Sequence, residues 1–179
     1  VKTTADAQGN FTVTLATPAA GGPFSIVFDD GDVLTVDNIL SGEVWLCSGQ
    51  SNMEMPLAGW GQVKDFQTEI AMANNPNVRL LQVHKNISTV PLDTVEFNGG
   101  GWVECTSGTV PGFSACAYFY ARELADKLGV PVGVIDTTWG GTPVEAWTPE
   151  EYMQIVPGFE TELADLKAAG GNADKMREI

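Results

Sequence analysis

Histidine and cysteine are scarce in this sequence, which limits the metal chemistry that it can support. It contains one histidine, His84, and three cysteines, none of them in a C-x-x-C pair. The usual zinc ligand sets cannot be assembled from these residues, so we expect no metal site. Cys47 lies in an apolar run and is expected to be buried. The three cysteines form no closed disulfide framework, and spacing alone does not decide whether Cys105 and Cys116 are bridged.

Positive charge is scarce as well. Lysine and arginine number 9 against 23 aspartates and glutamates, which gives a net charge of −14. Such a chain repels phosphate backbones, so a nucleic-acid partner is not expected. We interpret the acidity as an aid to solubility, because no motif supports the alternative of steering a cationic partner.

Long apolar runs are also absent. None approaches the roughly 20 residues of a membrane-spanning helix, so no membrane span is predicted. The first residues are polar and include no apolar core of a signal peptide. This says little about the compartment, since a processed chain would look the same.

The pattern of apolar and polar residues changes near residue 42. Before it, "NFTVTL" (10–15), "FSIVF" (24–28) and "VLTVDNIL" (33–40) surround the turn signal "DDGD" and predict antiparallel β-structure with little core of its own. We therefore predict a division into residues 1–41, the remainder of a small β-sandwich, and residues 42–179.

Three later apolar runs are continuous rather than alternating, as is typical of parallel strands covered on both faces. They occupy residues 44–47, 78–83 and 130–136. A helix is predicted over 114–128, with Ser114 as its N-cap and Gly129 just beyond its end. Strand, helix and strand in this order indicate an α/β fold with a parallel sheet.

Two segments are less regular. Residues 86–112 lack periodicity and are long for a connection, which suggests a functional loop. Their first residue, Asn86, fits the N-glycosylation pattern, which also occurs often by chance. The acidic residues after Pro149 are predicted to be helical.

A candidate nucleophile follows the first of the continuous runs. Ser51 lies in "SGQSN", and "TTWGGT" (137–142) follows the run at 130–136. Because the carboxyl ends of parallel strands meet at one edge of a sheet, these loops can face one pocket. A serine there can attack a carbonyl once a base takes its proton, and backbone N–H groups of Ser51, Gly140 and Gly141 can bind the oxyanion.

Less specific interpretations stay open at this point. Serine beside glycine and asparagine is common in turns, and the loop is not the G-x-S-x-G elbow of α/β-hydrolases. Ser48 is a rival nucleophile within the same loop. His84 ends a strand and could be a base, although a lone histidine is more often structural.

Two long stretches resemble one known family. "GEVWLCSGQSNMEMPL" (42–57) resembles the nucleophile block of the sialate O-acetylesterase family of SGNH-type hydrolases. "GFSACAYFYARELADKLGVPVGVIDTTWGGTPVEAW" (112–147) resembles the block that follows it, and the residues before 42 resemble the end of a preceding β-sandwich domain. The resemblance implies an SGNH-hydrolase-like three-layer α/β sandwich with a parallel sheet, here incomplete.

The resemblance also implies residue roles. Ser51 matches the nucleophile, and Gly140 or Gly141 is expected to supply an oxyanion N–H. Gln50 and Asn52 flank Ser51 and are expected to contact the oxyanion or the substrate. No metal or organic cofactor is implied.

The family's remaining catalytic blocks have no match in these 179 residues. They are roughly Trp-Tyr-Gln-Gly-Glu-x-Asn and a later Asp-x-x-His that supplies the base. His84 matches neither. We therefore expect a fragment whose catalytic Asp and His lie in a missing segment or in a second chain.

The expected function is a secreted or periplasmic carbohydrate O-acetylesterase. The substrate implied first is O-acetylated sialic acid, with acetylated xylan or another plant glycan as the alternative. A different class, a non-catalytic carbohydrate-binding or structural piece, also stays open. Trp45, Trp139 and Trp147 suit either a sugar site or core packing. Glu54 and Glu145 suit either sugar hydroxyls or the solvated surface.

Overall fold

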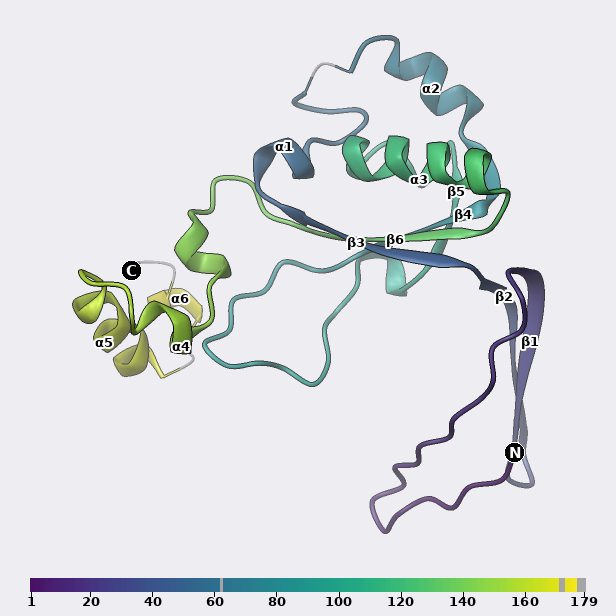
Figure 1. The fold of residues 1–179 in the computed structure, drawn as a ribbon, viewed down its shortest axis with the longest axis horizontal. Helices are drawn as coiled ribbons and strands as arrows, with labels where there is room; N and C mark the ends of the chain where they lie inside the picture. The colour runs from purple at the N-terminus through teal and green to yellow at the C-terminus, as the bar shows by residue number, and fades with distance from the viewer. Residues whose placement is uncertain (62, 171–172, 177–179) are drawn as a thin grey trace.

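A four-stranded sheet forms the centre of the structure, a computed structural model that describes residues 1–61, 63–170 and 173–176. The strands lie in the order β3-β6-β4-β5 (Figure 1). Their bounds are Glu43–Gly49 for β3, Asn74–Gln82 for β4, Val103–Thr106 for β5 and Val132–Thr138 for β6. Strand β6 pairs in parallel with both β3 and β4. The prediction of three neighbouring parallel strands is therefore confirmed, with each strand differing from its predicted bounds by a few residues.

Helix α3 (Ala115–Leu128) lies over one face of this sheet, as predicted for residues 114–128. The Ser114 hydroxyl accepts a hydrogen bond from the Ala117 backbone N–H at 3.1 Å, which confirms the predicted N-cap. Gly129 ends the helix in the left-handed region, with φ of 66°.

The hydrophobic core lies between α3 and this face of the sheet. Val78 and Leu80 from β4, and Val132 and Val134 from β6, are fully buried there. The helix meets them with small side chains, which allow it to approach closely; those that are buried are Ala115, Ala117, Ala121 and Ala125.

Strand β3 departs from its prediction. Its apolar run predicts burial on both faces, yet Val44 is 63% exposed and Leu46 is 66% exposed. The reason is that β3 is an edge strand and α3 covers only one face of the sheet. The long connection between β4 and β5 lies on the opposite side of the sheet (Figure 1). The α/β fold is thus confirmed, with a sheet that is mixed and incomplete within the described residues.

The amino-terminal segment contains one antiparallel hairpin, β1 (Gly21–Asp29) with β2 (Val33–Ser41). The turn at "DDGD" joins them as predicted. Residues 10–15 were predicted as a strand, and this is wrong: they have no ladder partner in the described structure, and Phe11 and Leu15 are about half exposed. Alternation alone cannot make a strand where no neighbour supplies its hydrogen bonds. Membership of this hairpin in a β-sandwich stays a prediction.

The segment 86–112 contains structure that its sequence did not indicate. Strand β5 pairs antiparallel with β4, and a short 3₁₀ turn, η1 (Asn98–Gly100), precedes it. β5 is only four residues long, so its pattern is too short to be recognised without its partner.

The remaining helices are short. α1 (Ser51–Glu54) and α2 (Phe66–Met72) follow β3, and η2 (Val144–Trp147) follows β6. The predicted helical tail forms α4 (Glu150–Met153), α5 (Glu160–Ala169) and α6 (Ala173–Met176). Among the described residues, no helix has both the length and the apolar character needed to cross a membrane.

All three cysteines are free thiols, so Cys105 and Cys116 are not bridged. Cys47 and Cys105 are buried, as expected for Cys47, while Cys116 is exposed. Burial raises the pKa of both buried thiols above the ordinary 9.0. They therefore stay protonated at neutral pH and act as small apolar side chains.

Ser114→Ala is expected to lower the free energy of unfolding by about 1–3 kcal/mol. The substitution removes the cap of α3 and also the hydrogen bond that Ser114 donates to the Met53 carbonyl at 2.5 Å, which ties α3 to α1. Urea denaturation measures the change. Ser107→Ala is the matched control, because Ser107 is exposed and makes no side-chain hydrogen bond to any described residue; it should stay within about 0.5 kcal/mol of wild type. Equal stability of both variants would contradict the packing described here.

Candidate active site

Ser51 begins α1 directly beyond the carboxyl end of β3. Gly49 makes this sharp change of direction possible, because it has φ of 147° and a Cβ there would lie 2.8 Å from Cγ of Met53. Ser51 is partly exposed, and its hydroxyl makes no hydrogen bond to any residue that the structure describes. The candidate nucleophile is thus accessible at the edge of the sheet where ligands of α/β folds bind.

The loop after β6 lies against Ser51. The register of β3 and β6 pairs Gly49 with Thr138, and the Trp139 backbone N–H donates to the Gly49 carbonyl at 2.9 Å. A Cβ on Gly140 would lie 3.0 Å from Ser51 Oγ and 2.5 Å from Glu54 Oε2, so glycine lets the loop approach both side chains closely. The structure therefore brings Ser51 and Gly140 together, and Gly141 follows on the exposed side of the loop.

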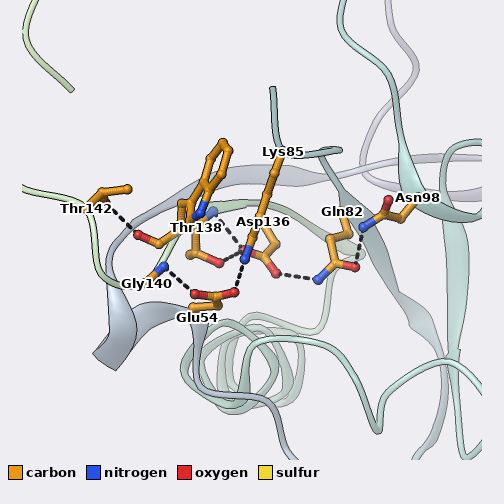
Figure 2. A network of polar contacts seen from close by, with 9 residues as sticks. Glu54, Gln82, Lys85, Asn98, Asp136, Thr138, Gly140 and Thr142 are labelled. Atoms are coloured by element: carbon orange, nitrogen blue, oxygen red, sulfur yellow. Dashed lines mark hydrogen bonds and ion pairs between the residues drawn. The ribbon is translucent and has the colours of Figure 1, made fainter. Parts of the chain in front are cut away.

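Glu54 joins these loops to a third one. One carboxylate oxygen accepts a hydrogen bond from the Gly140 backbone N–H, and the other pairs with the Lys85 ammonium (Figure 2). The bond from Lys85 is the main cause that lowers the pKa of Glu54 below its ordinary 4.5, with the Gly140 N–H adding to it. For Glu54 the sequence predicts only a contact with a sugar or a surface charge, because Gly140 and Lys85 are far from it in the chain.

Asp136, a buried residue of β6, holds the same loops through hydrogen bonds. It is 1% exposed and accepts hydrogen bonds from Thr138, through the hydroxyl at 2.6 Å and the backbone N–H at 3.2 Å. Its other oxygen accepts from Gln82 Nε2 at 3.1 Å, and Gln82 in turn accepts from Asn98 Nδ2 at 2.9 Å (Figure 2). This network joins the ends of β4 and β6 and the η1 turn. The apolar run around Asp136 gave no sign of it.

A cavity of about 230 Å³ opens beside this network. Its lining residues are Glu54, Gln82, Val83, His84, Lys85, Asn98, Asp136 and Thr138. Most of them carry hydrogen-bonding side chains, which suits a ligand rich in hydroxyl groups. Ser51 itself does not line the cavity, but Glu54 from the same short helix does.

His84 is not brought to Ser51. Its Nδ1 lies 3.2 Å from Asn98 Oδ1, and its backbone N–H donates to the Glu96 carbonyl at 2.8 Å. Because an amide oxygen only accepts, Nδ1 carries the hydrogen in this contact. No described contact joins His84 to Ser51, so the arrangement favours the structural role expected for this histidine.

The remaining candidate residues lie at different positions around Ser51 and in the loop after β6. The Ser48 hydroxyl donates to the Thr137 carbonyl at 3.4 Å, a long bond to the backbone of the neighbouring strand. Gln50 and Asn52 are exposed on either side of Ser51. Glu145 lies in η2 and is partly exposed.

The three tryptophans divide between packing and the site loops. Trp45 meets Tyr120 of α3 edge to face, with ring centroids 5.3 Å apart. Trp139 lies beneath the Lys85 ammonium, 5.6 Å from its ring centroid. The Trp147 indole donates to the Thr142 hydroxyl at 2.8 Å.

The described residues contain no cluster of histidine, cysteine, aspartate or glutamate that could hold a metal ion. The arrangement instead offers a free serine hydroxyl beside a glycine loop. That combination suits attack on an ester carbonyl, provided that a base is supplied.

Asp136→Asn is expected to destabilise the protein by about 1–3 kcal/mol, because an amide cannot accept from Thr138 and Gln82 at once without turning its NH₂ toward a donor. Urea denaturation tests this. Asp126→Asn, at an exposed position on α3, is the control and should leave the stability unchanged. An Asp136→Asn protein with the stability of wild type would show that the network does not hold the loops.

Comparison with known proteins places these features in a family. A family model described as carbohydrate esterase, sialic acid-specific acetylesterase, matches residues 41–172. Human sialate O-acetylesterase is 34% identical over 139 residues, which is 72% of this chain and 26% of the human protein. The rat protein of the same name is 30% identical over 158 residues, or 82% of this chain and 29% of the rat protein.

A solved structure agrees with the sequence relatives. The chain resembles a carbohydrate acetylesterase from Xanthomonas citri with a TM-score of 0.75 and 39% identity, over 84% of this chain and 34% of that one. The chain thus spans between about a quarter and a third of the length of these relatives. Ser51 and the loop at 139–142 both fall inside the matched range. By its sequence and its fold, the chain belongs to the family of carbohydrate esterases described as sialic acid-specific acetylesterases.

Proposed function

We propose that this chain carries the nucleophile of a carbohydrate O-acetylesterase, and that Ser51 is that nucleophile. The observation that carries the proposal is the position of the free Ser51 hydroxyl beside the glycine loop after β6, where a Cβ on Gly140 would lie 3.0 Å from it. The names of the relatives support the acetyl ester of a sugar as the substrate.

The reaction would proceed by acyl transfer. Ser51 Oγ forms a bond to the acetyl carbonyl carbon, a base takes its proton, and the carbonyl oxygen becomes an oxyanion. Backbone N–H groups of Ser51 and the glycine loop would stabilise that charge. The sugar oxygen then leaves with a proton, and water releases acetate from the serine ester. Gln50 and Asn52, exposed beside Ser51, are proposed to contact the substrate. None of these steps calls for a cofactor.

A base for this reaction must come from outside the described contacts of Ser51. We propose that a further polypeptide segment, in a longer form of the protein or in a second chain, supplies an Asp and a His. Strand β3 supports this, because among the described residues it pairs only with β6 and leaves one edge open. Val44 and Leu46 on this strand are each more than half exposed, and additional strands or a helix would cover them.

The proposed sugar is O-acetylated sialic acid, after the human and rat relatives, and the proposed compartment is secreted or periplasmic. The X. citri neighbour is named more broadly as a carbohydrate acetylesterase, so a neutral acetylated glycan is the second candidate. The polar cavity next to Glu54 is compatible with either.

The 179-residue chain alone is expected to hydrolyse p-nitrophenyl acetate poorly. A serine hydrolase without its base keeps only the residual catalysis of its oxyanion site, so the loss should be of order 10³-fold or more. Adding the segment that carries the family's Asp-x-x-His should restore the rate. Full activity of residues 1–179 would contradict the proposal and would make His84 the candidate base. A completed protein that binds acetylated sugars without cleaving them would favour the non-catalytic alternative.

Ser51→Ala in the completed protein should abolish acetate release from an O-acetylated sugar and leave the fold intact, since a partly exposed hydroxyl contributes only about ±0.5 kcal/mol to stability. Ser48→Ala is the matched control and should keep most of the activity, because its hydroxyl is directed to the Thr137 carbonyl. Acetate release is measured enzymatically and folding by circular dichroism. An inactive Ser48→Ala beside an active Ser51→Ala would move the nucleophile to Ser48.

A further inference from the structure

We propose that Glu54 is a positioning residue that fixes the Gly140 amide beside Ser51, and that Lys85 holds the Glu54 carboxylate in the orientation this requires. The inference rests on the proposed role of Ser51 for its catalytic meaning. The contacts themselves stand without it.

Glu54 is the point where three separate segments meet. It belongs to α1, which begins with Ser51, while Gly140 follows β6 and Lys85 follows β4. Each carboxylate oxygen has one partner, the Gly140 N–H for one and the Lys85 ammonium for the other (Figure 2). Rotation of Glu54 would break both contacts together, so the side chain has one favoured orientation.

The surroundings strengthen this arrangement. The Glu54 side chain is only 23% exposed and that of Lys85 is 42% exposed, so water screens the pair less than on an open surface. The Lys85 ammonium also lies 5.6 Å from the ring centroid of Trp139, the residue before Gly140. Lys85 therefore holds the loop both through Glu54 and through the indole ring.

The charge of the pair matters for an esterase. An ionised carboxylate next to a developing oxyanion would repel it, and the positive charge of Lys85 offsets that repulsion. The Gly140 N–H is already donated to Glu54, whereas the Gly141 N–H makes no hydrogen bond in the described structure. Glu54 thus occupies the Gly140 N–H and leaves the Gly141 N–H available to another acceptor.

The pH dependence follows from the lowered pKa of Glu54. Because this pKa lies below the ordinary 4.5, the Glu54 contacts contribute their full stabilisation of the folded protein above about pH 4.5. The stabilisation is lost as the pH falls through the pKa of the folded state. At neutral pH the carboxylate is ionised and the loop is held.

Amide NMR of the ¹⁵N-labelled 179-residue chain tests the contacts directly. At pH 7 the Gly140 amide proton should move upfield in Glu54→Gln, since a neutral amide oxygen is a weaker acceptor than a carboxylate. In wild type the same proton should titrate with Glu54, and Lys85→Met should raise the midpoint pH toward the ordinary value. The Gly129 amide, which donates to the Ala125 carbonyl, is the internal control and should not respond. Glu123→Gln, at an exposed position on α3, is the control variant.

A Gly140 amide that is unchanged in Glu54→Gln, or a midpoint that Lys85→Met does not move, would overturn the proposal. Labelling of Ser51 by a fluorophosphonate, in which the Oγ–P bond forms as fluoride leaves, adds a functional measure on the completed protein, which contains the base. Glu54→Ala should slow labelling roughly tenfold to a hundredfold, and Glu54→Gln should recover part of it because its oxygen still accepts from Gly140. Equal rates in wild type and Glu54→Ala would show that the contacts do not position the site. If wild-type Ser51 is never labelled, the proposed function fails, while the NMR result still decides the role of Glu54.

Discussion

The parallel pairing of β6 with two neighbours is the constraint on which the site depends. The register sets Gly49 of β3 beside Thr138, and Gln82 of β4 beside Asp136. All three strands therefore end at the same edge, and the loops that follow them must meet. Ser51, Lys85 and Gly140 come from stretches of sequence far apart, and this register alone makes them neighbours. Helix α3 supports it from one face through a layer of small side chains packed on Val78, Leu80, Val132 and Val134.

Two carboxylates then turn neighbouring loops into a defined geometry. Asp136 is buried and fully hydrogen-bonded, so it secures the ends of β4 and β6 without leaving an unsatisfied acceptor. Glu54 is nearer the surface and works through charge, since its pKa is lowered mainly by the bond from Lys85. Placed between Ser51 and the polar cavity, Glu54 connects the proposed reacting group with the space where a sugar could lie. The site therefore depends on polar contacts between loops as well as on the apolar core below them.

Much of this framework could be predicted from the sequence, and the remainder depends on partners that a linear pattern does not show. The continuous apolar runs, the Ser114 cap and the Gly129 end are local signals, and each corresponds to an element of the structure. Exposure of β3 was not predictable, because an apolar run shows what a strand can bury and not what covers it. The prediction of a strand at residues 10–15 was wrong, and β5 was not predicted at all. Both errors have one cause, because a strand forms only where a neighbouring strand pairs with it. The contacts of Glu54 with Gly140 and of Asp136 with Gln82 likewise join residues more than fifty positions apart. The contacts with Lys85 and Thr138 span fewer positions, but they too form only in the folded chain.

The central claim is that Ser51 is the residue whose hydroxyl oxygen accepts the acetyl group from the ester substrate. The most direct measurement is to incubate the completed protein, which includes the segment that supplies the base, with p-nitrophenyl acetate, quench it with acid, and locate the added acetyl group by fragmenting the peptide that contains both serines of the loop. We expect acetylation at Ser51 and none at Ser48, because of these two hydroxyls only that of Ser51 is free of a backbone acceptor and lies against the glycine loop. Acetylation at Ser48, or at surface lysines alone, would contradict it.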